Sequence, residues 1–110
     1  MSGEERDKVC RWCISDYGMG PQMDMCIEEM SELTKALLKY RRVDGAEWDK
    51  ARNDIIDEIA DVRIMCRQME LLFQAEEEVE RRIDFKIERQ RKRLINYEEE
   101  VKKNDTVTTA

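Results

Sequence analysis

Apolar residues recur at steps of three and four along two long stretches of the chain. In residues 21–42 they are Met23, Cys26, Met30, Leu33, Leu37 and Tyr40. In residues 48–73 they are Ile55, Ile59, Val62, Cys66, Met69 and Phe73. This spacing is typical of one face of an α-helix and not of a strand. It predicts two long helices, each with an apolar seam for packing on other helices.

Weaker signals predict two further helices. Ser2 followed by Glu5 is a capping-box signal for a helix over residues 3–17, which ends where Gly18, Gly20 and Pro21 follow. Residues 76–97 carry a thinner apolar stripe, with acidic residues first and basic residues later, as the helix dipole favours. Residues 102–110 have no period and are expected to form a disordered tail. The chain is therefore predicted to be all-α, a helical bundle of about four helices in a single domain over residues 1–101.

Composition narrows the possible partners and location. Charged residues make up 42% of the 110 residues and aromatic residues only 6%, which favours long solvated helices. A chain this small has a thin core, so we expect a homodimer or homotetramer. The net charge of -6 argues against binding a polynucleotide. Neither a membrane span nor a signal peptide is visible in the sequence, so a cytoplasmic protein that does not bind a membrane is expected.

The four cysteines do not form a metal-binding pattern. Cys10 and Cys13 form a C-x-x-C pair, whereas Cys26 and Cys66 stand alone and the chain has no histidine. Structural zinc usually needs two close pairs of ligands. The cysteines are therefore expected to pack mainly as small apolar side chains.

Four acidic residues lie where a solvated helix face would not put them. On a helical wheel, Glu29 and Glu32 flank the apolar face of the first long helix, and Glu58 and Asp61 flank that of the second. Two helices joined by a short loop pack antiparallel, so the two pairs can face each other. Four such carboxylates repel unless protons or cations neutralise them, and oxygen ligands without His or Cys select Mg²⁺ or Mn²⁺. The pattern predicts a Mg²⁺ site that binds a phosphorylated ligand.

The same residues resemble a known family. Residues 28–33, Glu-Glu-Met-Ser-Glu-Leu, and residues 57–62, Asp-Glu-Ile-Ala-Asp-Val, are similar to the E-E-x-x-E-L and E-x-x-D-V motifs of MazG-type pyrophosphohydrolases. Tyr17-Gly18 and Gln22 resemble the entry to the family's first motif helix. Lys86 and Arg89 resemble its K-x-x-R segment that contacts phosphate. The resemblance covers roughly residues 17 to 95.

The resemblance implies a reaction. MazG-type enzymes are helical bundles, assembled as dimers or tetramers, that cleave NTPs or dNTPs between the α- and β-phosphates to a monophosphate and pyrophosphate. The implied ligands of Mg²⁺, or of Mn²⁺ as a substitute, are Glu29, Glu32, Glu58 and Asp61. One of these acids or Glu28 would orient or deprotonate the attacking water, and the catalytic candidates are Glu28, Glu29 and Glu58. The expected contacts to the nucleotide substrate are Gln22, Lys35, Lys86 and Arg89.

Two other functions fit parts of the pattern. A non-enzymatic bundle or coiled-coil adaptor would explain the seam from Ile55 to Phe73 equally well. It would not explain acids beside the apolar faces of both long helices, because such a placement costs stability unless something pairs with them. A pyrophosphohydrolase acting on another phosphorylated metabolite, such as a nucleotide sugar, would keep the fold and the metal site. Base and sugar preference does not follow from these residues.

Overall fold

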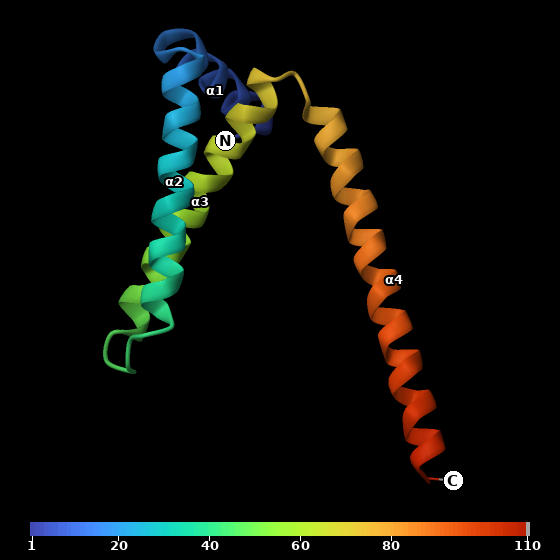
Figure 1. The fold of residues 1–110 in the computed structure, drawn as a ribbon. Helices are drawn as coiled ribbons and strands as arrows, with labels where there is room; N and C mark the ends of the chain where they lie inside the picture. The colour runs from blue at the N-terminus through green and yellow to red at the C-terminus, as the bar shows by residue number, and fades with distance from the viewer. Residues whose placement is uncertain (110) are drawn as a thin grey trace. The chain divides into compact units, whose positions relative to one another are not determined.

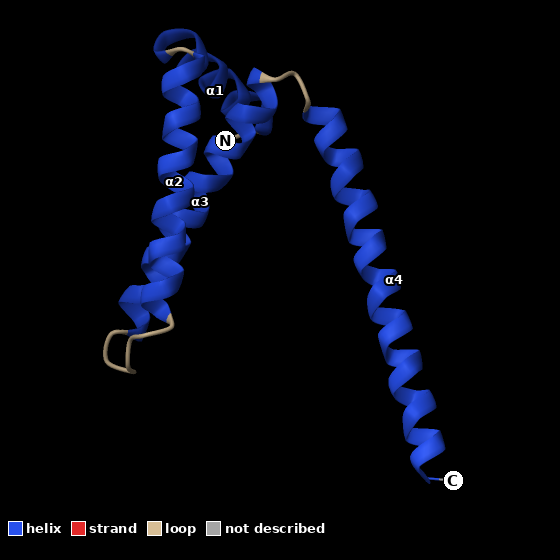
Figure 2. Cartoon of the chain, viewed as in Figure 1, coloured by secondary structure: helices blue, strands red, loops and turns tan. Residues whose placement is uncertain are grey.

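The protein is all-helical. The computed structural model describes the backbone of residues 1–109 and the side chains of residues 1–105. This part of the chain forms four α-helices and no strand: α1 (Gly3–Tyr17), α2 (Met19–Tyr40), α3 (Trp48–Leu72) and α4 (Glu76–Thr109) (Figure 1, Figure 2). The predicted all-α class and the four predicted helices are confirmed, and the oligomeric assembly stays a prediction.

The chain divides into two compact units, Met1–Ala75 and Glu76–Ala110. The first contains α1, α2 and α3, and the second contains α4; each is described by itself. The single domain expected over residues 1–101 stays a prediction.

α4 is longer than its apolar stripe indicates. It continues through residues 102–109, where the sequence predicted a disordered tail, and Ala110 lies outside the described residues. Glu98 and Glu99 precede Lys102 and Lys103 by four residues, a spacing that supports a helix without any apolar period.

Local chemistry sets the boundary between α1 and α2. The Ser2 hydroxyl accepts a hydrogen bond from the Glu5 amide at 3.1 Å and so caps α1, as predicted. Gly18 ends α1 with a φ of 92°, a left-handed conformation that favours glycine, and its amide donates to the Ile14 carbonyl at 2.9 Å. α2 then begins at once. Pro21 lies in its first turn, where a missing amide hydrogen breaks no helical hydrogen bond.

α2 and α3 form an antiparallel pair. Residues 41–47 join them, and the Asp44 carboxylate accepts a hydrogen bond from the Ala46 amide at 3.2 Å to stabilise the turn. At the base of the pair, the Trp48 indole N–H donates to the Tyr40 hydroxyl, and the two ring centroids lie 5.9 Å apart. From this end α3 runs along α2 and then diverges from it towards its far end (Figure 1), and theirs is the most extensive helix contact in the first unit.

The buried stripes of α2 and α3 share every second residue with the predicted seams and differ by one residue at the positions between. Every third or fourth residue along each stripe is buried or half-buried: Gln22, Cys26, Glu29, Leu33, Ala36 and Tyr40 on α2, and Ala51, Ile55, Glu58, Val62, Met65, Met69 and Leu72 on α3. Several members of the predicted seams are instead exposed, including Met30 (44%), Ile59 (42%) and Phe73 (57%). The predicted seams were therefore wrong at these positions, and Glu29 and Glu58 occupy places within the α2–α3 contact.

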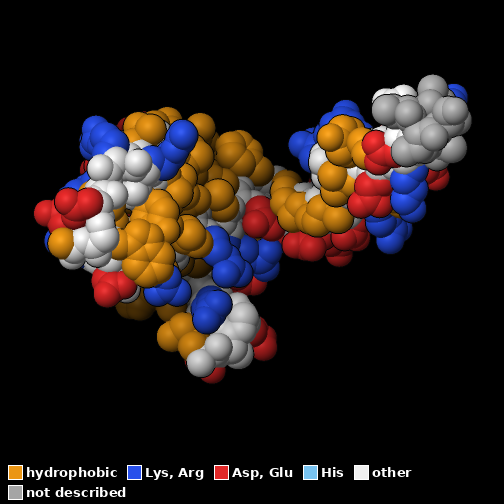
Figure 3. Space-filling view, turned by 90° about the horizontal axis from the view of Figure 1, so that it is seen from below, with side chains coloured by type: hydrophobic (Ala, Val, Ile, Leu, Met, Phe, Trp, Pro, Cys, Tyr) orange, Lys and Arg blue, Asp and Glu red, His pale blue; other side chains and the backbone are white. Residues whose placement is uncertain are grey.

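The core of the first unit is small. Its buried apolar residues among those described are Cys10, Cys26, Ala51, Met65 and Leu71. Packing of cysteines as small apolar residues is confirmed for Cys10 and Cys26, whereas Cys13 is half-buried and Cys66 is exposed. Apolar side chains also remain on the surface of this unit (Figure 3).

A part-buried ion pair joins α1 to α3. The Arg67 guanidinium donates to both carboxylate oxygens of Asp7, at 2.9 and 2.7 Å, and it also lies 3.3 Å from Glu70. The hydrogen bond from Arg67 lowers the pKa of Asp7 from its ordinary value of 3.8. Two-point geometry of this kind fixes orientation as well as distance.

We expect Asp7→Asn to lower the melting temperature at pH 7. Because the pKa of Asp7 is lower in the folded chain, the ion pair stabilises the fold above pH 3.8, and this stabilisation disappears as the pH falls through the lower, folded value. Thermal melting by circular dichroism should therefore show a gap between wild type and variant that narrows in acid. Asp16→Asn, on the exposed face of α1, is the matched control. A gap that does not depend on pH would contradict this role.

Candidate metal centre

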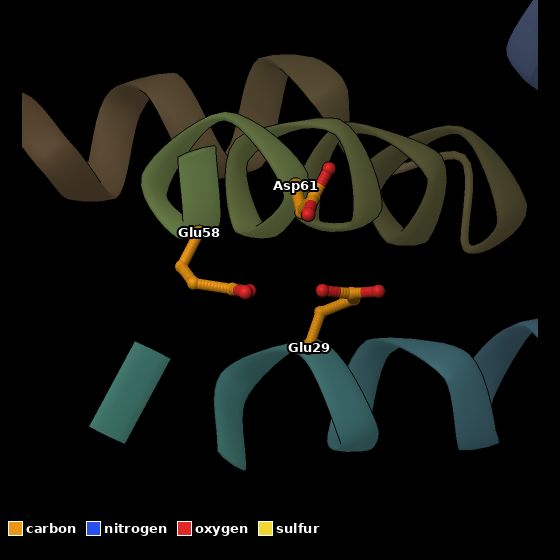
Figure 4. Close-up of side chains that lie close together, drawn as sticks. All are labelled: Glu29, Glu58 and Asp61. Atoms are coloured by element: carbon orange, nitrogen blue, oxygen red, sulfur yellow. The ribbon is translucent and has the colours of Figure 1, made fainter. Parts of the chain in front are cut away.

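Three carboxylates gather between α2 and α3. Glu29 extends from α2, and Glu58 and Asp61 extend from α3 (Figure 4). One oxygen of each lies within 4.8 Å of one oxygen of each of the others. Glu29 and Glu58 come from the buried stripes of their helices, and Asp61 follows Glu58 by nearly one helical turn. The antiparallel pairing thus converts two short sequence motifs into one cluster.

The cluster has no cationic partner within the described part of the chain. No ion pair found there involves any of its three acids. The Oε2 atom of Glu58 is buried and lacks a hydrogen-bond partner. An unpaired buried carboxylate oxygen is costly, so this atom is a strong indication that a proton or a cation belongs beside it.

The electrostatics of Glu29 support the same conclusion. Burial, followed by the negative charges of Asp61 and Glu58, raises the pKa of Glu29. Carboxylates whose oxygens lie within 4.8 Å of one another are accommodated either by a shared proton or by a cation. At neutral pH a bound cation would remove the repulsion without requiring a proton.

The donor set fits a hard divalent ion. Three carboxylates supply only oxygen ligands, which suit Mg²⁺ and Mn²⁺, and no His or Cys belongs to the cluster. Mg²⁺ commonly takes a few protein carboxylates and completes its shell with water or substrate phosphate. The residues present therefore fit the predicted cofactor.

Glu32, the fourth predicted ligand, lies outside the cluster. Its carboxylate is 3.4 Å from the ammonium group of Lys35, one turn further along α2. Both side chains of this pair are largely solvent-exposed, and exposed pairs of this kind contribute little to stability. The structure thus brings three of the four predicted acids together and pairs the fourth with a predicted substrate-binding lysine.

The other predicted site residues occupy different environments. Glu28 is exposed on α2 beside Glu29, whereas Gln22 is buried in the same stripe, about two turns nearer the start of the helix. Lys86 and Arg89 are exposed residues of α4 and belong to the second unit. Within the described residues, the structure adds to the cluster no acid that the sequence had not already indicated.

Comparisons of the chain with models of protein families, with curated proteins and with solved structures found no match. By length and apolar content, none of the described helices qualifies as a membrane span.

We expect Glu58→Gln to raise the melting temperature by a few degrees in the absence of divalent ions. The substitution removes one of three mutually repelling charges and provides an amide that can donate to a neighbouring carboxylate. In the wild type, Mg²⁺ at 100 times its Kd should add about 2.7 kcal/mol to the free energy of unfolding. Glu58→Gln should lose most of this gain.

Calorimetry with EDTA and then with excess Mg²⁺ measures both effects. If the wild type melts at one temperature under the two conditions, the cluster does not bind Mg²⁺.

Proposed function

We propose that this chain is a Mg²⁺-dependent, MazG-like nucleoside triphosphate pyrophosphohydrolase. It would cleave an NTP or dNTP between the α- and β-phosphates, giving a monophosphate and pyrophosphate. The observation that carries the proposal is the position of Glu29 and Glu58 inside the α2–α3 contact, with Asp61 beside them. Their sequence context, which resembles the two MazG motifs, supports a nucleotide as the phosphorylated ligand.

The position of the acids favours this function over an adaptor. A bundle that served only to bind other proteins would gain stability from apolar residues at these places in the helix contact. Glu29 and Glu58 instead place charge there, and the Glu58 oxygen without a partner is left for an external ligand. A ligand-binding site would explain why charged side chains lie in the helix contact, which packing alone does not explain.

Each acidic residue has a role in the proposed reaction. Glu29, Glu58 and Asp61 would hold Mg²⁺, which when bound polarises phosphate oxygens and lowers the pKa of a coordinated water. The four acids Glu28, Glu29, Glu58 and Asp61 are the groups available to orient the attacking water and accept its proton. Glu28 is exposed next to the cluster, so it can contact solvent and a bound substrate together.

The remaining predicted residues would bind the triphosphate. Lys35 is held only by its exposed pair with Glu32, so exchanging that carboxylate for a phosphate oxygen costs little. Lys86 and Arg89, two cations nearly one turn apart on α4, stay candidates for contacts to phosphate because they resemble the family's K-x-x-R segment. Gln22, with its buried side chain, would help to shape the site from within α2.

The exposed parts of the predicted seams support a homodimer or homotetramer. Met23, Met30 and Leu37 on α2 and Ile59 and Phe73 on α3 are all more than one third exposed in the single chain. Association of copies would remove this apolar surface from water. The small core of the first unit makes such association a substantial source of stability.

We expect the wild-type protein to release pyrophosphate, and not orthophosphate, from at least one NTP or dNTP in the presence of Mg²⁺. Glu58→Gln should reduce the rate by about 100-fold or more, because it removes a ligand from the metal centre. A coupled pyrophosphate assay over a panel of nucleotides, with orthophosphate measured in parallel, provides the test. Circular dichroism should show unchanged helical content in the variant.

Asp57→Asn is the matched control for this experiment. It removes one negative charge from the same helix, one residue away, at an exposed position outside the cluster. Its activity should stay close to wild type. Equal activity of wild type and Glu58→Gln would overturn the assignment of the site, and release of orthophosphate alone would overturn the reaction.

A further inference from the structure

We infer that α4 pairs antiparallel with α4 of a second copy of this chain, so that the two helices form a coiled coil. This pairing rests neither on the metal site nor on the proposed reaction.

α4 leaves its apolar side chains exposed. It is one continuous helix of 34 residues, and none of its described side chains is buried (Figure 1). Leu94 and Tyr97, for example, are 55% and 66% exposed. A single helix cannot bury its own apolar face, and most helix stability in proteins comes from packing of that face. α4 therefore presents a surface for a partner.

The exposed face has the repeat of a coiled coil. Its positions follow one another at alternating steps of four and three residues, and we call them the α4 seam: Ile83, Ile87, Gln90, Leu94, Tyr97 and Val101. The seam extends over about three heptads, and Gln90 is its one polar member. Such a repeat keeps one face turned toward a partner helix along its whole length.

A groove lies over the middle of the α4 seam. It is lined by Ile87, Gln90, Arg91, Leu94, Ile95 and Glu98. Three of these residues belong to the seam, and Arg91 and Glu98 flank it. In a coiled coil, each seam side chain of one helix inserts into a hole between side chains of the other. The groove provides a place of this kind for the side chains of a second helix.

Charge along α4 selects a second copy as the partner. Residues 86–93 contain five cationic residues and one acidic residue, whereas residues 98–100 are three glutamates. When a second α4 runs in the opposite direction, the acidic segment of each chain lies against the basic segment of the other. The two-fold symmetry of the pair makes this match twice. The helix is thus complementary to itself, in charge as well as in apolar surface.

One antiparallel register satisfies the central apolar positions. Leu94 lies opposite Tyr97 of the partner subunit, and Gln90 lies opposite Val101 of the partner subunit. Each of these contacts occurs twice because the pair is symmetric.

The same register pairs the charges beside the seam. Arg91 flanks Glu98 of the partner subunit, and Arg93 flanks Glu100 of the partner subunit. Charges at such positions set the partner and the orientation of a coiled coil. Near the ends of the register Asp84 approaches Asp105 of the partner subunit, which is a like-charged contact, but the central contacts all join opposite charges.

A parallel pair would have the wrong charges. It would set Lys86 beside Arg91 of the partner subunit and Glu100 beside Asp105 of the partner subunit. Both contacts join like charges, which disfavours this orientation.

Cross-linking of the full chain tests the pairing. Unlabelled chains and chains labelled with a heavy nitrogen isotope are denatured together, refolded and treated with an amine-specific cross-linker. Mass spectrometry should find Lys86 of a light chain linked to Lys103 of a heavy chain, because the register places them within about 3 Å of one level along the helix axis.

Other cross-linking results would overturn the inference. Light–heavy links from Lys86 only to Lys86 would show a parallel pair. Links from α4 only to lysines of α1, α2 or α3 in the other chain would show that α4 docks elsewhere on the second copy. Absence of any light–heavy link from α4 would show that it does not pair.

Arg91→Glu and Glu98→Arg test the orientation through charge. In the antiparallel register each variant alone sets like charges against each other, so each should lower the yield of the light–heavy link at least about threefold. A mixture of the two variants should restore the yield, because every Arg91–Glu98 contact between chains again joins opposite charges. Restoration also separates pairing from the loss of the ion pair that Arg91 makes with Glu88 in its own helix.

The parallel pair predicts a different result for Arg91→Glu, since the new carboxylate would then lie beside Lys86 of the partner subunit and strengthen the link. A stronger link in this variant, or a mixture that does not restore the yield, would overturn the inference.

Leu94→Asp and Phe85→Asp test the apolar seam as a matched pair. Both residues are more than half exposed, but they lie nine residues apart and so on opposite sides of the helix. Leu94→Asp should abolish the light–heavy link, whereas Phe85→Asp should retain it, with the helical content of both checked by circular dichroism. Equal loss in the two variants, or retention in both, would overturn the assignment of the seam.

Discussion

The contact between α2 and α3 determines both the fold of the first unit and its chemistry. Apolar and aromatic residues close this contact at its ends, where Tyr40 meets Trp48 and where Met65 and Leu72 are buried or half-buried. Between these ends lie Glu29 and Glu58, which repel each other. Packing of the two helices holds these two charges close together despite their repulsion. A cation bound between them would remove that repulsion and so stabilise the fold.

Because the core of the first unit is small, the repulsion between Glu29 and Glu58 matters for its stability. Few apolar residues of the first unit are buried, so apolar burial contributes little to its free energy of unfolding. Repulsion between Glu29 and Glu58 in its largest helix contact is therefore large relative to that free energy. The ion pair between Asp7 and Arg67 holds α1 against α3 in a unit that buries few apolar residues. In such a protein, ligand binding and folding stability are closely linked, because an ion that binds only the folded state stabilises it directly.

Much of the fold follows from the sequence. The capping-box signal at Ser2 correctly located the start of α1, since it depends on a local hydrogen bond. The sequence did not predict the full length of α4. The prediction relied on an apolar period, whereas the last part of the helix is supported by the spacing of its charged residues.

The predicted seams were correct at alternate positions and wrong at the others for a different reason. A helical wheel gives the centre of the apolar residues on one helix. It does not show that α3 packs on α1 as well as on α2, nor that Ile59 and Phe73 stay exposed. Glu29 and Glu58 were predicted at the edge of the apolar faces and lie within the buried stripes. Glu32 shows the limit of spacing alone: it belongs to the motif, yet Lys35 one turn away binds its carboxylate.

The central claim is that Glu29, Glu58 and Asp61 form a divalent metal site, and direct binding of Mn²⁺ tests it most simply. Electron paramagnetic resonance detects free hexaaquo Mn²⁺, whose signal is lost when the ion is bound by protein. We expect the wild-type protein to deplete this signal in a saturable way, Mg²⁺ to restore it by competition, and Asp61→Asn to weaken the depletion strongly. An Mn²⁺ signal that the wild-type protein leaves unchanged would contradict the existence of the site.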